Sequence, residues 1–435
     1  MNIYIETYGC QMNVADSELV KTILIENGHQ IVKKIDFADV IIFNTCSVRQ
    51  HAENRVIGRI TNESSRKAQN KNIKIGMIGC VAQRMGKELL DKKIGLDFVL
   101  GVDQYLKLPE ILTELKTKKQ ISKIKLDNKE LYNNLYPTRN SKYHAFVTIM
   151  RGCNNFCTYC IVPYTRGRER SRPYENIISE IEKAGKTGRK NIILLGQNVN
   201  SYDYENVNFP QLLEKINRID SIRRIRFITS HPKDLSDQLI QVMAKSEKVC
   251  EHIHLAMQSG NDEILRKMNR GYTANHFLNL TKKLRKAMPD IAITTDVIAG
   301  FPGETETQFN DTYQLMKKIE FDYAFTFKYS PREGTKAAQF ENQVAESIRL
   351  KRLQKLIKLQ EKVTHKKYRE QIGKIQTVFV GKVSKKSDKE LAGKTRDFKI
   401  TVFEGNKDLI GSFVKVKIVD ATGWTLKGKL IKKVE

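Results

Sequence analysis

The stretch RGCNNFCTYC, residues 151–160, places Cys153, Cys157 and Cys160 close together in the spacing C-x3-C-x2-C. Three thiolates supplied by one short loop suit a soft metal centre. A structural zinc ion wants four ligands, and the two C-x2-C pairs of zinc modules are not found here. Three ligands from one loop are typical instead of an iron–sulfur cluster whose remaining iron is open to another ligand. The spacing therefore favours such a cluster over zinc.

A second group of cysteines is visible only in the spacing along the chain. Cys10, Cys46 and Cys80 are 36 and 34 residues apart, about one βα unit each, and each follows an apolar stretch. Because the carboxyl ends of parallel strands share one edge of a sheet, we expect these thiols to converge on a second three-thiolate site. Taken singly, each could be a small buried apolar side chain, but three cysteines at equivalent positions in successive βα units fit that alternative poorly. Cys250 lacks such a pattern, and we expect it to be a buried structural thiol.

The region 1–115 is predicted to be a parallel α/β domain of the Rossmann or flavodoxin-like kind. Apolar strands alternate there with helical patterns, the strands being NIYIETYGC, ADVIIFNTC, NIKIGMIGC and DFVLGVD. In the first helix, Asp16 or Ser17 is the expected N-cap and Gly28 the expected end. The polar, weakly periodic segment 116–139 is expected to be a linker.

The region 140–370 contains six further strand candidates separated by helices, which predicts a partial (β/α)6 barrel or an open sheet. In either arrangement, ligands gather at the carboxyl ends of the strands. The stretch 345–372 is predicted to be one long basic amphipathic helix. The region 371–435 changes to a period of two with glycine-bearing turns, which predicts a small all-β barrel.

The chain is strongly basic, with a formal net charge of +27 and an isoelectric point near 9.6. This charge favours a polyanionic partner such as nucleic acid, although a general richness in Lys, Ile and Asn explains it as well. The start of the chain does not resemble a secretory signal, and the apolar stretches are too short to span a bilayer. We therefore expect a cytoplasmic protein without a membrane partner.

Several motifs, taken in order along nearly the whole chain, resemble one family. They are YGCQMNVADSE, NTCSVRQHAENR, GCVAQR, CTYCIVPYTRGRERSRP, LLGQNVNSY and FPGETE. This set resembles the methylthiotransferases of the radical S-adenosylmethionine superfamily, and looks closest to the tRNA isopentenyladenosine methylthiotransferases. One departure is HLAMQSG, where the family pattern is HLPVQSG; Ala256 and Met257 put the details of that strand in doubt.

The resemblance implies a cofactor set and a reaction. Two [4Fe–4S] clusters would bind, one on Cys10, Cys46 and Cys80 and one on Cys153, Cys157 and Cys160, the latter with S-adenosylmethionine. A radical made from that cofactor would take hydrogen from C2 of N6-isopentenyladenosine at tRNA position 37, and the first cluster would deliver sulfur, giving 2-methylthio-N6-isopentenyladenosine. No catalytic acid–base pair is expected, since C2 is unactivated. The β module would be an RNA-binding TRAM domain, and a monomer that uses an electron donor and a sulfur source is expected.

Polar residues near the predicted strand ends are candidates for binding the cofactor. They are Gln197, Asn198, Ser230, Gln258, Ser259 and Asp296. The alternative for the amides is that they cap strands. Four arginines beside the cysteine loop are candidates for tRNA phosphates, namely Arg166, Arg168, Arg170 and Arg172. The alternative is that these arginines lie on a solvent-exposed loop that does not bind tRNA.

Two other functions remain open at this point. One is a methylthiotransferase that acts on threonylcarbamoyladenosine tRNA or on a ribosomal-protein aspartate, although those relatives lack the QMN that follows Cys10 here. The other is a non-catalytic RNA-binding protein with structural metal sites, which predicts zinc at the cysteines.

Overall fold

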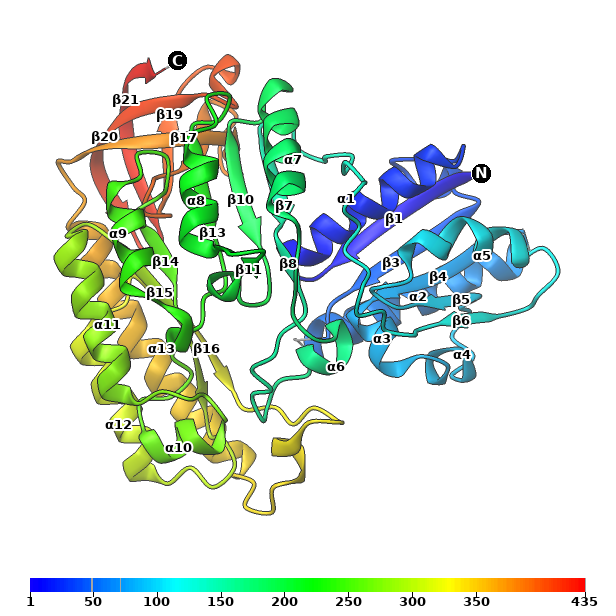
Figure 1. Cartoon of the computed structure of the whole chain (residues 1–435), viewed down its shortest axis with the longest axis horizontal. Helices are drawn as coiled ribbons and strands as arrows, with labels where there is room; N and C mark the ends of the chain where they lie inside the picture. The colour runs from blue at the N-terminus through cyan, green and yellow to red at the C-terminus, as the bar shows by residue number, and fades with distance from the viewer. Residues whose placement is uncertain (48–49, 71, 435) are drawn as a thin grey trace.

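The computed structural model describes residues 1–47, 50–70 and 72–434 (Figure 1). Its N-terminal unit is a six-stranded parallel sheet with the order β2-β1-β3-β4-β5-β6. The strands are β1 (Asn2–Tyr8), β2 (Gln30–Ile31), β3 (Val40–Thr45), β4 (Lys74–Gly79), β5 (Phe98–Leu100) and β6 (Ile121–Lys123). The helices are α1 (Gln11–Glu26), α2 (Gln50–Gln69), α3 (Cys80–Met85), α4 (Glu88–Asp91) and α5 (Leu108–Glu114), with short 3-10 turns η1 (Ile35–Phe37) and η2 (Tyr105–Lys107). The predicted parallel α/β class is confirmed.

Helix α1 begins earlier than the sequence indicates. Its N-cap is Cys10, which is in the extended conformation, so the predicted cap at Asp16 or Ser17 is wrong. Both residues are instead buried within the helix, where an unpaired carboxylate would be costly. Gly28 follows the helix with φ +78°, the left-handed conformation that favours glycine after a helix end.

The segment 116–139, expected to be a linker, belongs in part to this first sheet. It supplies β6, which pairs in parallel with β5 from Phe98↔Ile121 onward. Farther on, the buried Tyr132 ring stacks on Tyr105 at 5.7 Å, and its hydroxyl donates to the carbonyl of Val102 at 2.9 Å. The pattern of polar and apolar residues does not predict these contacts, because β6 is only three residues long and Tyr132 has polar neighbours in the sequence.

The middle unit is a curved parallel sheet with strands in chain order. Its halves, β13-β10-β7 and β14-β15-β16, are joined by parallel bridges Ile225↔Val249 and Ser230↔Leu255. The strands are β7 (His144–Thr148), β10 (Asn191–Leu195), β13 (Arg224–Phe227), β14 (His252–His254), β15 (Ala292–Ala299) and β16 (Tyr323–Lys328). All six strand candidates are thus present, and this is the predicted partial barrel.

Helices cover the outer face of this sheet (Figure 1). They are α7 (Tyr174–Lys186), α8 (Phe209–Asn217), α9 (Asp237–Lys245), α10 (Asp262–Lys267), α11 (Ala274–Ala287), α12 (Glu306–Ile319) and the long α13 (Glu346–Arg369). Apart from α10, whose Ile264 packs in a separate small cluster, their apolar faces and the strands form one buried cluster, in which the Phe209 and Phe227 rings meet edge to face at 5.0 Å. Smaller elements are α6 (Val162–Arg166), the ladders β8 (Met150–Arg151)–β9 (Arg170–Ser171) and β11 (Asp203–Tyr204)–β12 (Val207–Asn208), and the turns η3 (Val199–Ser201), η4 (Pro232–Asp234) and η5 (Lys336–Gln339).

The C-terminal unit is a closed barrel with the strand order β17-β18-β19-β21-β20. Its strands are β17 (Ile375–Val383), β18 (Glu390–Lys394), β19 (Ile400–Glu404), β20 (Phe413–Thr422) and β21 (Thr425–Val434), with the turn η6 (Lys407–Leu409). It docks on β13 through Arg226, whose Nη2 donates to the carbonyls of Thr395 and Arg396 at 3.2 and 3.0 Å. The Phe398 ring stacks on His252 at 4.8 Å.

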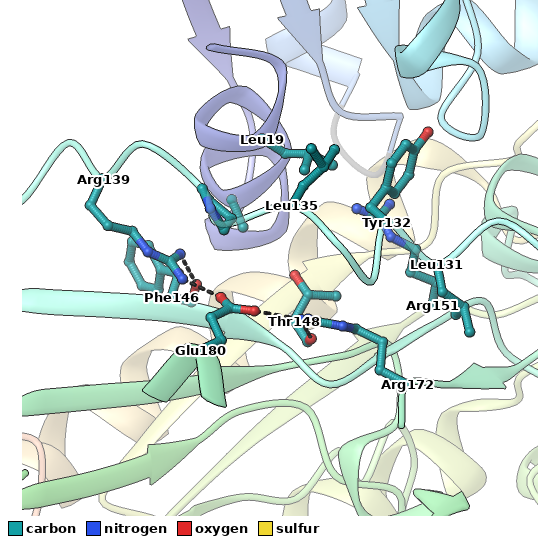
Figure 2. Close-up of a pocket in the computed structure, with 12 residues that line it drawn as sticks. Leu19, Leu131, Tyr132, Leu135, Arg139, Phe146, Thr148, Arg151, Arg172 and Glu180 are labelled. Carbon is teal, nitrogen blue, oxygen red and sulfur yellow. Dashed lines mark hydrogen bonds and ion pairs between the residues drawn. The ribbon is translucent and has the colours of Figure 1, made fainter. Parts of the chain in front are cut away.

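The first two units meet where α1 packs against β7 (Figure 1). Arg139 lies at this contact and pairs with Glu18 of α1. Arg139 also pairs with Glu180 of α7, and Arg172 donates to the same Glu180 at 2.8 Å (Figure 2). A cavity of about 20 Å³ remains between them, lined also by Leu19, Leu135, Phe146 and Thr148. A cavity of this size holds one water molecule at most. The contact is therefore close-packed, which fixes α1 on the barrel.

Across the described residues, no helix combines the length and the apolar content needed to cross a bilayer.

Candidate active site

The cysteines of the N-terminal unit stand at neighbouring strand ends. Cys46 follows β3 and Cys80 follows β4 directly, and the registers Tyr8↔Thr45 and Thr45↔Gly79 align these ends with the end of β1. The Cys10 thiol is within hydrogen-bond reach of Cys46, which lowers the pKa of Cys10 to about 6. Burial raises the pKa of the Cys80 thiol. The structure therefore brings Cys10, Cys46 and Cys80 together.

Small residues and a buried amide pair make this approach possible. A Cβ on Gly9 would lie 2.6 Å from Cβ of Cys46, so a larger residue there would displace the cysteine. Asn13 Nδ2 donates to Asn44 Oδ1 at 3.0 Å and to the carbonyl of Thr45 at 3.2 Å, tying α1 to β3. These bonds fix the start of α1, and with it Cys10, beside the sheet.

The cysteines of the middle unit lie on the loop that connects β8 to β9. The ladder Arg151↔Arg170 closes this loop at its base, and the amide of Cys153 donates to the carbonyl of Gly167 at 3.2 Å. The amide of Cys160 donates to the carbonyl of Cys157 at 2.9 Å, which makes a tight turn. Burial raises the pKa of Cys160 to about 12, so ligation by its thiolate needs a compensating positive charge.

Each group of cysteines has one buried arginine that donates to a thiol. Arg166 Nε is 3.3 Å from Sγ of Cys80, and Arg270 Nη1 is 3.4 Å from Sγ of Cys157. The two arginines are 4% and 5% exposed. A buried guanidinium stabilises a thiolate and compensates the negative charge of a cluster. Arg270 was not predicted from the sequence, where nothing distinguishes it from other arginines.

Within the described part of the chain, no three His, Cys, Asp or Glu side chains are gathered tightly enough to hold a single metal ion. A cluster distributes its cysteines over separate irons, so it does not need such a cage.

Four buried polar atoms at the mouth of the barrel have no hydrogen-bond partner among the described residues: Gln197 Oε1, Ser230 Oγ, His231 Nε2 and Gln258 Oε1. They come from three neighbouring strand ends on the cysteine-loop side. Buried polar atoms are rarely left unpaired, so this set fits a polar ligand such as S-adenosylmethionine. His231 was not singled out as a ligand contact from the sequence; its unpaired Nε2 becomes visible only in the fold.

Asn198 and Ser259, also predicted as cofactor contacts, are engaged by the protein. Asn198 Nδ2 donates to Asp234 at 2.7 Å and its Oδ1 accepts from the amide of His231 at 3.1 Å. Ser259 Oγ is 3.2 Å from Thr312 Oγ1 and is fully buried. These polar atoms hold the surrounding loops in place, and a direct contact of the two side chains with a cofactor stays a prediction.

Asp296, the remaining candidate, lies on β15 and faces the barrel interior. Its Oδ2 is 3.1 Å from Nε2 of His254 on β14, and the carboxylate is partly exposed. It therefore keeps free acceptor capacity toward a bound molecule.

Three of the four arginines predicted to contact tRNA phosphates are engaged within the protein. Each of the three is buried and paired with a carboxylate: Arg166 with Asp16 at 2.8 Å, Arg170 with Asp103 at 3.0 Å, and Arg172 with Glu180 at 2.8 Å. The number of charges along the sequence reveals neither this burial nor the carboxylate partners, two of which (Asp16 and Asp103) come from the first unit. Only Arg168 is exposed, with its guanidinium over the Phe156 ring at 4.2 Å.

Family models match all three units. Residues 2–101 match the uncharacterized protein family UPF0004, residues 147–316 match the radical SAM superfamily, and residues 369–431 match the TRAM domain. Together with the cysteine loop, these matches define the class, the radical S-adenosylmethionine enzymes.

Curated relatives narrow this class. A tRNA-2-methylthio-N(6)-dimethylallyladenosine synthase of Thermoanaerobacter sp. (strain X514) is 47% identical over 99% of this chain and 93% of its own length. A protein of the same name from Clostridium botulinum (strain Langeland) is 47% identical over 98% and 96%. The chain belongs to the family of tRNA-2-methylthio-N(6)-dimethylallyladenosine synthases.

Solved structures agree on the fold. The radical S-adenosylmethionine methyltransferase TsrM from Kitasatospora setae, with cobalamin and a [4Fe-4S] cluster bound, superposes with a TM-score of 0.61. The sequences are 12% identical, and the match covers 78% of this chain and 74% of TsrM. At this identity, the similarity concerns the fold alone.

Proposed function

We propose that this chain transfers a methylthio group to C2 of N6-isopentenyladenosine at position 37 of tRNA, giving 2-methylthio-N6-isopentenyladenosine. The observation that carries the proposal is the pair of cysteine groups, each with a buried arginine on one thiol, held by two units that share a close-packed contact. The names of relatives at 47% identity over nearly the whole chain support the same substrate.

Cys153, Cys157 and Cys160 would hold one [4Fe–4S] cluster and Cys10, Cys46 and Cys80 a second. When reduced in the presence of S-adenosylmethionine, a radical-site cluster supplies the one-electron chemistry needed to remove an unactivated hydrogen. The protein's part is to bind, orient and exclude water. Arg270 neutralises charge at Cys157, and it also fixes the fourth strand end, since its Nη2 donates to the carbonyl of Ala256 at 2.6 Å.

S-adenosylmethionine would lie over the unpaired atoms of Gln197, Ser230, His231 and Gln258. Burial lowers the pKa of His231 to about 2, so the ring is neutral at physiological pH. Because its Nδ1 accepts from the amide of Lys233 at 3.2 Å, its Nε2 carries the hydrogen and is available as a donor toward a carboxylate. Asp296 would accept from a cofactor hydroxyl or amine.

We propose that unpaired tRNA bases reach this mouth along a line of aromatic rings. Trp424 of the C-terminal barrel contacts Tyr323 at 5.3 Å, Tyr323 contacts Phe325 at 4.7 Å, and Phe325 contacts His254 at 6.0 Å beside Asp296. Trp424 and Phe325 are 39% and 38% exposed. Exposed rings in a basic protein provide platforms on which bases stack.

Further features complete the proposal. The chain works as a cytoplasmic monomer with an external electron donor and a sulfur source. The domain boundaries lie near residues 139 and 370, because β6 and Tyr132 pack with the first unit. Elution from a sizing column at the mass of one chain, 50.1 kDa, would support the monomer.

The deciding experiment is anaerobic reconstitution followed by single-turnover assay. We expect about eight irons per chain, and about four after replacement of Cys10, Cys46 and Cys80 by alanine. With dithionite and S-adenosylmethionine, nucleoside mass spectrometry should show the methylthio product on an isopentenylated anticodon stem-loop and none on the unmodified stem-loop. Zinc in place of iron, or product only on a threonylcarbamoylated substrate, would overturn the proposal.

A further inference from the structure

Asp16 is a fully buried carboxylate that two arginines of the middle unit share. Its Oδ1 accepts from Arg151 Nη2 and its Oδ2 accepts from Arg166 Nη2, both at 2.8 Å. The hydroxyl of Tyr105 adds a weaker contact at 3.4 Å. Burial by itself would raise the pKa of Asp16, but the two guanidinium groups hold that pKa below its usual value. The side chain is therefore a charged bridge between the two units.

The residues of this bridge are close in sequence to both cysteine groups. Asp16 is on the helix that starts at Cys10, Arg151 precedes Cys153, and Arg166 ends the helix that follows Cys160. Arg166 also donates to the Cys80 thiol. Because Arg166 and the radical-site cysteines share the loop closed by β8 and β9, that loop contacts both cysteine groups.

The charges and hydrogen bonds of the bridge are incomplete without a further anion. Two buried guanidinium groups face one carboxylate, and the Arg151 guanidinium also lies over the Tyr132 ring at 4.7 Å. Arg166 Nη1 is buried and has no acceptor among the described residues. If a cluster binds here, its ligand Cys80 would be a thiolate that supplies the missing charge, and a cluster sulfide would supply the missing acceptor.

We propose that Arg166, fixed by Asp16, is a positioning residue for the site formed by Cys10, Cys46 and Cys80: it sets the distance of this site from the radical loop and tunes the sulfur atoms that it contacts. This inference rests on the proposed function. This role of Arg166 differs from the binding of a tRNA phosphate. Hydrogen bonds to cluster sulfurs raise the reduction potential, so removal of this donor should lower it.

The chain provides a matched control in Arg170. It lies on the same loop, and its two Nη atoms pair with the buried carboxylate of Asp103 at 3.0 and 3.1 Å. Its Nη2 also donates to the main-chain carbonyl of Arg166 at 3.2 Å, but among the described residues it contacts no thiol. Arg166→Gln and Arg170→Gln each remove one buried guanidinium from the contact between the units. A purely structural role predicts the same effects for both variants.

The first measurement uses full-length protein in which Cys153, Cys157 and Cys160 are alanine, so that one cluster remains. We expect Arg166→Gln to shift the midpoint potential of that cluster to more negative values and to change its electron paramagnetic resonance spectrum. Arg170→Gln should leave both unchanged. If Arg166→Gln does not yield folded protein, Arg166→Lys replaces it, because lysine keeps the charge but lacks the planar pair of donors.

The second measurement uses the complete enzyme and counts methylthio product per 5′-deoxyadenosine released. We expect Arg166→Gln to lower this ratio by about 10²-fold through misplacement, while 5′-deoxyadenosine formation persists. Equal ratios and equal potentials in the Arg166 and Arg170 variants would overturn the inference. A parent protein that binds only one cluster, or forms no methylthio product, would overturn the proposed function instead.

Discussion

Arg270 Nη1 lies 3.4 Å from Cys157 Sγ, and Nη2 of the same guanidinium lies 2.6 Å from the carbonyl of Ala256. One buried side chain thus joins the cysteine loop to the strand end that carries Gln258. This position follows from the left-handed conformation of Asn269, whose Nδ2 donates to the carbonyl of Asn155 at 2.9 Å and holds the loop against the end of α10.

Replacement of Arg270 should weaken the radical site. In Arg270→Gln, loss of the charged donor to Cys157 should reduce iron retention or 5′-deoxyadenosine formation by about 10- to 100-fold, as for other groups that support metal ligands. Iron analysis and product quantification under reducing, anaerobic conditions test this. Arg266→Gln removes an exposed arginine of the neighbouring helix and should behave as the unsubstituted protein does.

The cysteine loop requires glycine at position 152. There φ is +76°, and an added Cβ would lie 2.0 Å from the carbonyl oxygen of Arg168. Gly152→Ala should therefore cost about 1–3 kcal/mol through overpacking in addition to backbone strain, and should lower iron content. Gly188 has a similar φ of +87°, but no atom lies near the position of an added Cβ. Gly188→Ala therefore measures the cost of backbone strain alone, about 1–2 kcal/mol. Thermal unfolding and iron analysis compare the two. Similar losses in both would show that the close approach has no effect.

Trp424→Ala should weaken tRNA binding without affecting the clusters. A stacked base contributes about 1–3 kcal/mol, which corresponds to about 5- to 150-fold in Kd. Fluorescence anisotropy with an isopentenylated stem-loop at fixed salt measures the change, and Phe325→Ala should give a comparable loss. Phe37, 64% exposed on the N-terminal unit, provides the control Phe37→Ala. Unchanged affinity in Trp424→Ala and Phe325→Ala would exclude the aromatic line as a base-binding surface.

Glu304 should make stability depend on pH. Burial raises its pKa from 4.5 to about 7, against the opposing effects of the Gly300 amide and Arg352. The protonated form is favoured in the fold, so the stabilisation is complete below about pH 4.5 and is lost as pH rises through 7. The loss is about 3 kcal/mol. When the pH is raised from 5.5 to 8, the melting temperature of the apoprotein should fall more in the unsubstituted protein than in Glu304→Gln. A parallel fall in both would contradict the assignment to Glu304.

The predicted strands and the grouping of cysteines follow from local signals. Buried parallel strands are short apolar runs, and their shared direction places Cys46 and Cys80 at one edge without any knowledge of side-chain packing. This explains why the predicted strand positions agree with the fold.

Contacts between segments that lie far apart in the sequence cannot be predicted from such local signals. Arg166 meets Asp16 from 150 residues away, so a run of arginines looked like a solvent-facing basic patch. Asn198 was correctly located at the barrel mouth, but its orientation toward the His231 amide depends on the left-handed turn at Thr229. The orientation of a polar side chain cannot be predicted from the sequence wherever the side chain could bind either a ligand or another part of the protein.

The three thiols of the N-terminal unit are unequally shielded. Cys10 is exposed, whereas Cys46 and Cys80 are buried, the latter beneath Arg166. On the proposed function, a small sulfur donor would therefore approach this site from the side of the first turn of α1. Such an approach would leave the two large units in contact.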